Sequence, residues 1–334
     1  MSAPALPAEP ATPESFRCGP VEVRLAAASE PLRDKIVETL GLYTVPWPAP
    51  ALRLAVAAGF VPQPPAMRKG SFLRCGRMLV DALGPELVAT CRSGAACRSS
   101  AGTTEWRIEV PASATPGSEV PEDIEDLVGL ILTTGWRRLG LVPIHAGSAV
   151  RNGSCAFLCA SSGGGKTTLT AALLREGWRT LGDDKLLLEL DEAGEPRIAS
   201  LIDRFNLHPE ARRWFPEVGD LAVLPRYSAW TEKRKVAVES IWPGAMLRRA
   251  RPTHLIRIER RPELEGVHLA PLARAEILPT LLRQTVIPND PATMRRLLPL
   301  LAATARGLVG HALTIGRDAY RRPGWSTPLA EALA

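Results

Sequence analysis

The sequence predicts an α/β protein with a mixed sheet core that carries a Gly-rich phosphate-binding loop, preceded by a smaller, mostly β subdomain. Two observations support this fold class. A short apolar strand pattern runs directly into the segment SSGGGKTT, and helical periodicity follows it. The N-terminal third instead contains several short strand patterns separated by Pro and Gly, with no repeat and no catalytic motif. With 334 residues, the chain is long enough for two such parts.

The composition is that of a globular protein, with 46% apolar and 23% charged residues. The net charge of +6 comes mostly from scattered Arg, without a basic run of five, so we expect no nucleic-acid partner. Six Cys without a CxxC pair predict buried free thiols in a reducing cytosol. Neither a signal-peptide pattern nor an apolar stretch of membrane length is seen, so we expect a cytoplasmic protein without a membrane partner.

Composition shifts along the chain predict its domain organisation. Residues 1–15 are rich in Ala and Pro and are expected to be a disordered tail. Residues 16–115 form the mostly β subdomain, and PASATPGSEVP at 111–121 is typical of a linker. The loop-bearing domain is predicted over 120–320, followed by a mobile tail at 321–334.

The N-terminal subdomain is predicted to combine one helix with short strands. Apolar spacing over residues 30–42 indicates the helix. Residues 52–56 lie in a Pro-rich region and are expected to be an edge strand. Further strands are predicted at 21–25, 71–75, 77–82, 86–91 and 105–110.

A helix, a hairpin and a strand are predicted to lead into the Gly-rich loop. The helix covers Pro121 to Leu139, with acidic residues in its first turns and Arg near its end, as the helix dipole favours. A strand over Val142–Val150 follows. Asn152-Gly153 tolerates the positive φ angles of a tight turn, so 151–154 is expected to connect this strand to Cys155–Ala160.

The segment from Ala160 to Thr168 has the residues of a P-loop, although Ala160 stands where the strict motif begins with Gly. Glycines let backbone N–H groups surround a phosphate chain, and the helix N-terminus adds positive charge there. Lys166 would reach the β and γ phosphates, and the Thr167 hydroxyl would bind Mg²⁺. A flexible linker is the alternative, which the flanking strand and helix disfavour. The predicted nucleotide-binding residues are Ser162, Gly163, Gly164, Gly165, Lys166, Thr167 and Thr168.

Two adjacent carboxylates, Asp183 and Asp184, follow Lys166 by 17 and 18 residues, beyond one short helix. Adjacent carboxylates are costly unless a cation neutralises them. A magnesium–nucleotide complex would do so, with one Asp holding the metal and the other accepting a proton from a nucleophile. The alternative is an exposed turn. An acidic motif on the very next strand is unusual, because most P-loop proteins carry it on a later one.

Three segments, Ile144-His145-Ala146, Ala160 to Thr168 and Leu181-Gly182-Asp183-Asp184, resemble the HPr serine kinase family. The Gly-Asp-Asp step also resembles the ATP-type phosphoenolpyruvate carboxykinases, which share that nucleotide fold. The clear resemblance covers residues 142–196 and does not extend over 1–115. It implies a mixed sheet core of the HPr kinase and phosphoenolpyruvate carboxykinase type.

The resemblance implies a kinase that moves the γ-phosphate of ATP, with Mg²⁺, to a serine of a protein or peptide. It assigns Lys166 to the phosphates, Asp183 as the general base, and Thr167 with Asp184 to the metal. His145 would orient the aspartate, although a lone His in a strand can also be purely structural. Members of the family form oligomers, so it also implies a homo-oligomer.

The sequence departs from the family because it lacks the Arg-Gly-x-Gly segment that meets the HPr substrate. It therefore resembles a divergent member of the family. Such relatives include kinases that tailor ribosomal peptides such as lasso peptides, so the resemblance implies a substrate of that class. Lys233, Arg234 and Lys235 are candidates to close over phosphates, or else part of a solvated hairpin. A small-molecule kinase, a carboxykinase-like enzyme and a nucleotide-binding regulator without chemistry remain as alternatives.

The remaining C-terminal portion is predicted to alternate strands and helices. Helical spacing indicates helices at 208–219, 274–285 and 292–306. Strands are predicted at 186–190, 198–202, 236–241, 254–259 and 308–315.

Overall fold

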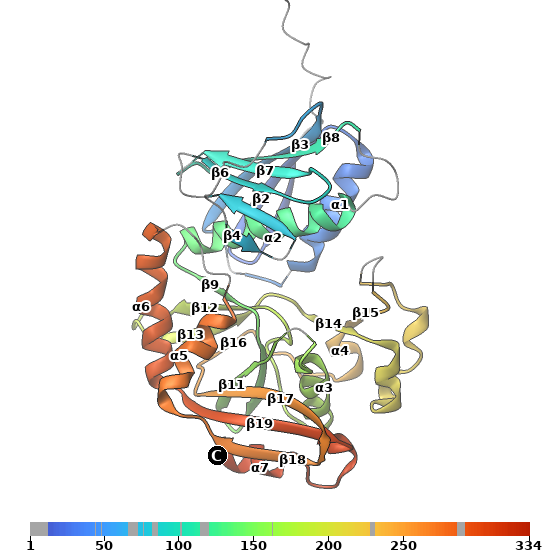
Figure 1. The fold of residues 1–334 in the computed structure, drawn as a ribbon, viewed down its shortest axis with the longest axis vertical. Helices are drawn as coiled ribbons and strands as arrows, with labels where there is room; N and C mark the ends of the chain where they lie inside the picture. The colour runs from blue at the N-terminus through green and yellow to red at the C-terminus, as the bar shows by residue number, and fades with distance from the viewer. Residues whose placement is uncertain are drawn as a thin grey trace, which may run out of the picture. The chain divides into compact units, whose positions relative to one another are not determined.

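The computed structural model divides into two compact units (Figure 1). Unit 1 comprises Met1–Gly140 with Ile287–Arg295, and unit 2 comprises Leu141–Val286 with Arg296–Ala334. The structure describes residues 13–43, 45–47, 49–65, 73–75, 77–81, 86–100, 102–113, 120–161, 163–227, 231–285 and 291–334.

Unit 1 is built on one eight-stranded sheet with the order β1-β2-β3-β8-β7-β6-β5-β4. The pairs β2–β3 and β3–β8 are parallel, and the remaining pairs are antiparallel. Two parallel pairs in a row require crossover connections, which α1 and the other strands provide. The strands are β1 (Glu14–Cys18), β2 (Val21–Ala27), β3 (Leu52–Val61), β4 (Leu73–Cys75), β5 (Met78–Asp81), β6 (Glu86–Thr90), β7 (Ala96–Ser100) and β8 (Glu105–Pro111).

Two helices of unit 1, α1 (Glu30–Leu40) and α2 (Val120–Arg138), pack against each other and against β2. The Trp136 indole donates a hydrogen bond to the Cys18 carbonyl at 3.2 Å, and its ring meets Tyr43 edge to face. Gly135 allows α2 to approach the sheet closely, because a Cβ there would lie 3.0 Å from Leu54 Cδ1. Helix α2 therefore belongs to unit 1, whereas the sequence placed it in the loop-bearing domain.

Three expectations for unit 1 are corrected. The strand expected at 52–56 as an edge is the central β3, because the Pro residues flank it rather than interrupt it. Strand β7, whose small polar residues lack a clear alternation, was not predicted. Glu14 and Ser15 were assigned to the disordered tail but pair with β2. Residues 1–12 and 114–119, in the tail and the expected linker, lie outside the described residues.

Unit 2 contains a five-stranded sheet, β10-β11-β17-β19-β18, and a four-stranded sheet, β16-β13-β12-β9. In the first sheet β11, β17 and β19 run parallel, and the outer strands are antiparallel. A further pair joins β14 (Arg204–Leu207) to β15 (Arg234–Ala237). The sheet strands are β9 (Val142–Ile144), β10 (Gly147–Arg151), β11 (Ser154–Cys159), β12 (Leu186–Leu190), β13 (Pro196–Ser200), β16 (Arg249–Ala250), β17 (His254–Glu265), β18 (Val267–Pro271) and β19 (Val309–Arg317).

The five-stranded sheet is buried on both faces, as parallel strands usually are. Alternate residues of β11 point to opposite sides: Ala156 and Leu158 join one apolar cluster, and Phe157 joins the other. The first cluster contains α3 (Lys166–Arg175) and α7 (Thr327–Ala332), and the second contains β9, β12, α5 (Arg274–Arg283) and α6 (Pro291–Gly307). The result is a layered α/β core, as the sequence predicted.

Several expectations for unit 2 are confirmed. The predicted turn joins β10 to β11, with φ of 50° at Asn152 and 84° at Gly153. The strand before the Gly-rich loop and the helix after it are present as β11 and α3. Five cysteines, Cys18, Cys91, Cys97, Cys155 and Cys159, are buried free thiols.

Other expectations for unit 2 are corrected. The strand predicted at Val142–Val150 is two strands, β9 and β10, which belong to different sheets and separate at His145. Residues 208–219 form short 3₁₀ turns, η2 (Pro209–Arg213) and η3 (Pro216–Val218), because prolines interrupt them. The strand expected at 236–241 ends at Ala237 and continues as the single helical turn α4 (Val238–Ile241).

The C-terminal tail, expected to be mobile, is a packed part of unit 2. Helix α7 buries Leu329 completely, and Trp325 and Leu333 lie in the same apolar cluster as Ile258. Leu329 and Leu333 are four residues apart, as on one face of a helix, but the Arg and Pro residues before them pointed to an irregular segment. In the described part of the chain, no helix is long and apolar enough to cross a membrane.

Candidate active site

The Gly-rich loop connects the end of β11 to the start of α3, and its shape requires glycine. Gly163 and Gly165 have φ of 72° and 93°, a region that side chains disfavour. A Cβ on Gly164 would lie 2.7 Å from the Ala160 Cβ and 2.9 Å from the Ser161 carbonyl oxygen. Ser162, predicted to bind phosphate, lies outside the described residues. Gly164 is therefore closely packed against Ala160 and Ser161, and α3 begins directly after Gly165.

Lys166 is the first residue of helix α3. The backbone N–H groups of a first helical turn have no carbonyl acceptor within the helix. The Lys166 ammonium group lies 3.2 Å from the Ala160 carbonyl and 3.1 Å from His145 Nε2. The side chain is largely buried, and burial lowers its pKa. Neither contact neutralises the charge, so the N-terminus of α3 and Lys166 together form a positive site suited to an anion.

His145 connects the loop Lys to the acidic pair. Its Nδ1 lies 3.2 Å from Asp184 Oδ1, and its Nε2 faces the Lys166 ammonium. An ammonium group only donates, so Nε2 accepts and the ring proton of the neutral imidazole lies on Nδ1, where it donates to Asp184. Desolvation, with the charges of the neighbouring lysines, lowers the pKa of His145 by more than the charge of Asp184 raises it, which favours this neutral form.

The two aspartates have different surroundings. Asp183 is only 4% exposed, and the Thr167 hydroxyl hydrogen-bonds to its carboxyl group. Burial, followed by the charge of Asp184, raises the pKa of Asp183 to about 7. The Asp184 side chain is 37% exposed and lines the cavity beside His145. The pair therefore is not an exposed turn, because one carboxyl group is buried under the loop and the other faces the cavity.

A buried polar network fixes the position of the aspartate turn against β10. Ser148 Oγ accepts a hydrogen bond from the Leu181 N–H at 2.8 Å and lies 3.0 Å from Thr180 Oγ1. The Ser148 N–H donates to the Gly182 carbonyl, and the Gly182 N–H donates to Thr180 Oγ1. These hydrogen bonds join residues 180–182 to β10, so they position the turn that carries the two carboxyl groups.

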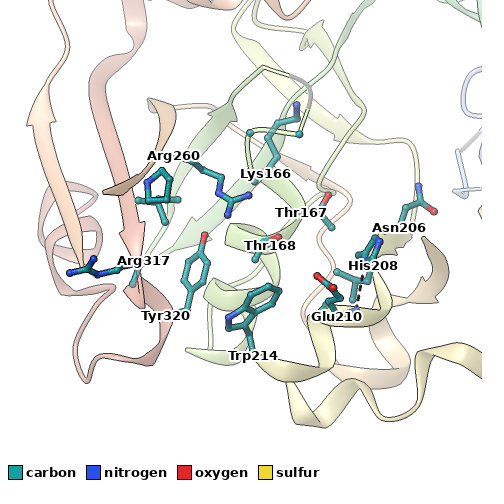
Figure 2. Close-up of a pocket in the computed structure, with 18 of the residues that line it drawn as sticks. Lys166, Thr167, Thr168, Asn206, His208, Glu210, Trp214, Arg260, Arg317 and Tyr320 are labelled. Carbon is teal, nitrogen blue, oxygen red and sulfur yellow. Dashed lines mark hydrogen bonds between the residues drawn. The ribbon is translucent and has the colours of Figure 1, made fainter. Parts of the chain in front are cut away.

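The glycine loop, Lys166, His145 and Asp184 line a cavity of about 770 Å³ in unit 2. Figure 2 shows that side chains from distant segments surround Thr167 and Thr168: Asn206 and His208 lie on one side in this view, and Arg260 and Tyr320 on the other. Its lining residues that carry polar or aromatic groups are His145, Lys166, Thr167, Thr168, Asp184, Asn206, His208, Glu210, Trp214, Lys233, Arg260, Arg317, Asp318, Tyr320 and Arg321.

Of the three basic candidates at 233–235, only Lys233 lines this cavity. Arg234 instead donates to the Leu224 carbonyl at 3.0 Å, and Lys235 pairs along β15 with Asn206 of β14. Sequence reasoning missed Trp214, Arg260 and Tyr320. No local pattern marks them, because the chain folding brings each to the loop from a different segment.

The donor set fits a magnesium ion held together with a nucleotide. Among the described residues there is no group of three or more His, Cys, Asp or Glu side chains that could hold a metal alone. Mg²⁺ at nucleotide sites needs only one or two carboxylates, with phosphate oxygens and water as the other ligands. The Thr167 hydroxyl and the Asp183 carboxyl group, which are joined by a hydrogen bond at the start of α3, provide such oxygens.

No protein-family model matches the chain, and no curated protein matches its sequence. Among solved structures, the HPr(Ser) kinase/phosphatase from Coxiella burnetii is similar to it, with 10% sequence identity over 57% of this chain and 94% of that chain. The TM-score of that alignment is 0.31, which is too low to support conclusions about fold or function. Any function must therefore be supported by the residues of the site.

Proposed function

We propose that this protein is an ATP- and Mg²⁺-dependent kinase that transfers the γ-phosphate to a hydroxyl group, a serine of a protein or of a ribosomal peptide. One observation supports this most strongly. The glycine loop, Lys166 and Asp184 beside His145 line one cavity, and Asp183 lies buried under the loop with a hydrogen bond to the Thr167 hydroxyl.

The loop and Lys166 would bind the triphosphate. Backbone N–H groups at the start of α3 point to the cavity end of the helix, where the dipole favours negative charge. Lys166 would exchange its contacts with Ala160 and His145 for phosphate oxygens. A phosphate is a much stronger partner for an ammonium group than a carbonyl or a neutral imidazole.

Thr167 and Asp183 would hold Mg²⁺, which supplies positive charge that neutralises the phosphates when bound. This differs from the expectation that Asp184 has the metal role. Asp183 is the carboxyl group that contacts the Thr167 hydroxyl, and its location under the loop leaves it no access to an acceptor.

Asp184 would then be the general base, instead of Asp183. Its carboxylate lies on the cavity wall, and the His145 Nδ1–H donates to one of its oxygens and orients it. The acceptor hydroxyl would give its proton to Asp184 as its oxygen bonds to the γ-phosphorus, the bond to the β-phosphate breaks, and ADP leaves. The serine acceptor is proposed because the loop, the Asp pair and His145 resemble the HPr serine kinases.

The test is transfer of label from γ-labelled ATP to peptides encoded beside the gene, with each aspartate changed in turn. We expect Asp184→Asn to slow transfer roughly 10²- to 10⁴-fold with nucleotide affinity retained. Asp183→Asn should instead weaken magnesium–nucleotide binding, and Lys166→Ala should abolish it. Asp220→Asn, an exposed carboxylate at the start of η4 (Leu221–Val223), is the matched control.

Two outcomes would contradict the proposal in different ways. Tight ATP binding with no label on any acceptor would indicate a nucleotide-binding regulator. Transfer that persists at the normal rate in Asp184→Asn would show that Asp184 is not the base.

A further inference from the structure

The structure brings an arginine to the phosphate-binding loop that the sequence did not single out. Strands β11 and β17 run parallel, with Cys159 opposite Arg257. Strand β11 ends there, whereas β17 continues to Glu265 and so passes alongside the loop. This extension places Arg260 three residues beyond the last paired position, at the carboxyl end of the sheet where open α/β folds bind ligands.

The stem of Arg260 lies over the loop itself. A Cβ on Gly165 would be 3.4 Å from the Arg260 Cδ and 3.8 Å from its Cγ. Gly165 is the residue that immediately precedes Lys166 and α3. The stem of Arg260 therefore lies next to the N-terminus of α3. Figure 2 shows its guanidinium group pointing toward Tyr320 and Thr168.

No ion pair neutralises Arg260 in the part of the chain that the structure describes. Among the described residues it has no ion-pair or hydrogen-bond partner, whereas Arg317, from the same cavity, is paired with Glu265. The charge of Arg260 instead acts on the partly buried Tyr320, whose ring meets that of Trp325 edge to face with 5.1 Å between the ring centroids. Two cations, Lys166 and Arg260, thus flank the start of α3, and among the described residues neither forms an ion pair, although the charges of Asp183 and Asp184 act on Lys166. A bound anion would stabilise this arrangement.

We propose that Arg260 contacts the phosphate chain of the nucleotide bound at the glycine loop. A guanidinium group is planar and forms two parallel hydrogen bonds to a phosphate, which an ammonium group does not. Arg260 would thus complete the site in the place where the sequence suggested Lys233, Arg234 and Lys235. This inference rests on the proposed function, because it assigns a residue to the same nucleotide.

The test measures binding of Mg²⁺–ADP, and of a non-hydrolysable ATP analogue with Mg²⁺, by calorimetry. Arg260→Gln keeps a stem that can lie over Gly165 but removes the charge, and Arg260→Lys keeps the charge without the planar group. The control is Arg261→Gln, on the same strand, because Arg261 is paired with Glu259 and lies outside the cavity lining. Thermal melting checks that each variant is folded.

We expect Arg260→Gln to weaken both ligands roughly 10- to 100-fold, the usual loss for hydrogen bonds to a charged group, with Arg260→Lys between it and the wild type. Arg260→Gln binding with the affinity of Arg261→Gln would overturn this inference and leave the proposed function intact. Absence of nucleotide binding by the wild-type protein would overturn the proposed function, and this inference with it.

Discussion

The two neighbouring aspartates differ in chemistry because their side chains point into different surroundings. Asp183 is buried beside the Thr167 hydroxyl, and Asp184 faces the cavity and His145. Adjacent side chains of an extended segment point to opposite sides, so one of the two aspartates is expected to face inward. Because the two residues are identical, the sequence does not show which one it is. The sequence therefore located the pair, and only the packing distinguished the two roles that we propose.

The raised pKa of Asp183 predicts a pH-dependent stability in the absence of metal and nucleotide. Its pKa is 3.8 in the unfolded chain and about 7 when folded, so between these values the folded state holds a proton that the unfolded state has lost. The free energy of unfolding should thus fall as the pH rises from 4 to 7, by up to about 4 kcal/mol. Asp183→Asn, which does not titrate, should lack this loss.

The measurement is urea unfolding with EDTA at several pH values, for the wild type and for Asp183→Asn. We expect the free energy of unfolding of Asp183→Asn to increase relative to that of the wild type as the pH rises. At pH 4 the variant should be no more stable than the wild type. A stability difference that is the same at every pH would contradict the prediction, since it would show that the Asp183 carboxyl group does not change its protonation in this range.

At the scale of elements, some segments around the site follow from local sequence patterns and others do not. The loop, β11 and α3 follow from a contiguous pattern of glycines and apolar residues, and the structure has them where the sequence predicted them. The expected mobile tail is the opposite case. It packs as α7, and its Trp325 contacts Tyr320 of η5 (Ala319–Arg321), which lines the cavity.

Helix α7 should consequently be important for the stability of unit 2. Leu329 is completely buried among residues that include Ile258 and Ile315, so Leu329→Ala should lower the free energy of unfolding by roughly 2–5 kcal/mol. Chemical denaturation is the measurement. Leu190→Ala, at the half-exposed end of β12, is the control and should cost much less. Equal effects of the two substitutions would show that the tail is not packed as described.

At the scale of the whole molecule, the two units have separate sheets, and both apolar clusters on the five-stranded sheet consist of unit 2 residues alone. The buried residues of unit 1, such as Leu54 and Trp136, lie outside these clusters. Helix α2 was assigned to the loop-bearing domain because it precedes β9 directly in the sequence. Its apolar face packs against β2 and β8 of unit 1, as the close approach at Gly135 shows. Proximity along the chain is a poor guide to domain membership when a helix is amphipathic and either domain could cover it.

Two separate cores predict two unfolding transitions in calorimetry, because each unit can unfold cooperatively by itself. We expect Mg²⁺–ATP to raise only the transition of unit 2, where the loop lies. Gly135→Leu, which forces a side chain against Leu54, should lower only the transition of unit 1. A single transition that both changes shift would contradict independent unfolding of the units.

The sequence by itself determined the α/β class, the Gly-rich loop with Lys166 and Thr167 between a strand and a helix, and the acidic pair that follows. Each of these depends on residues close together in the chain, so periodicity and spacing are sufficient to predict them. Only the tertiary structure decided that Asp184 rather than Asp183 lies on the cavity wall, that Arg260 lies over the loop and that the C-terminal tail is packed. These features depend on contacts between residues far apart in the sequence, which local patterns do not encode.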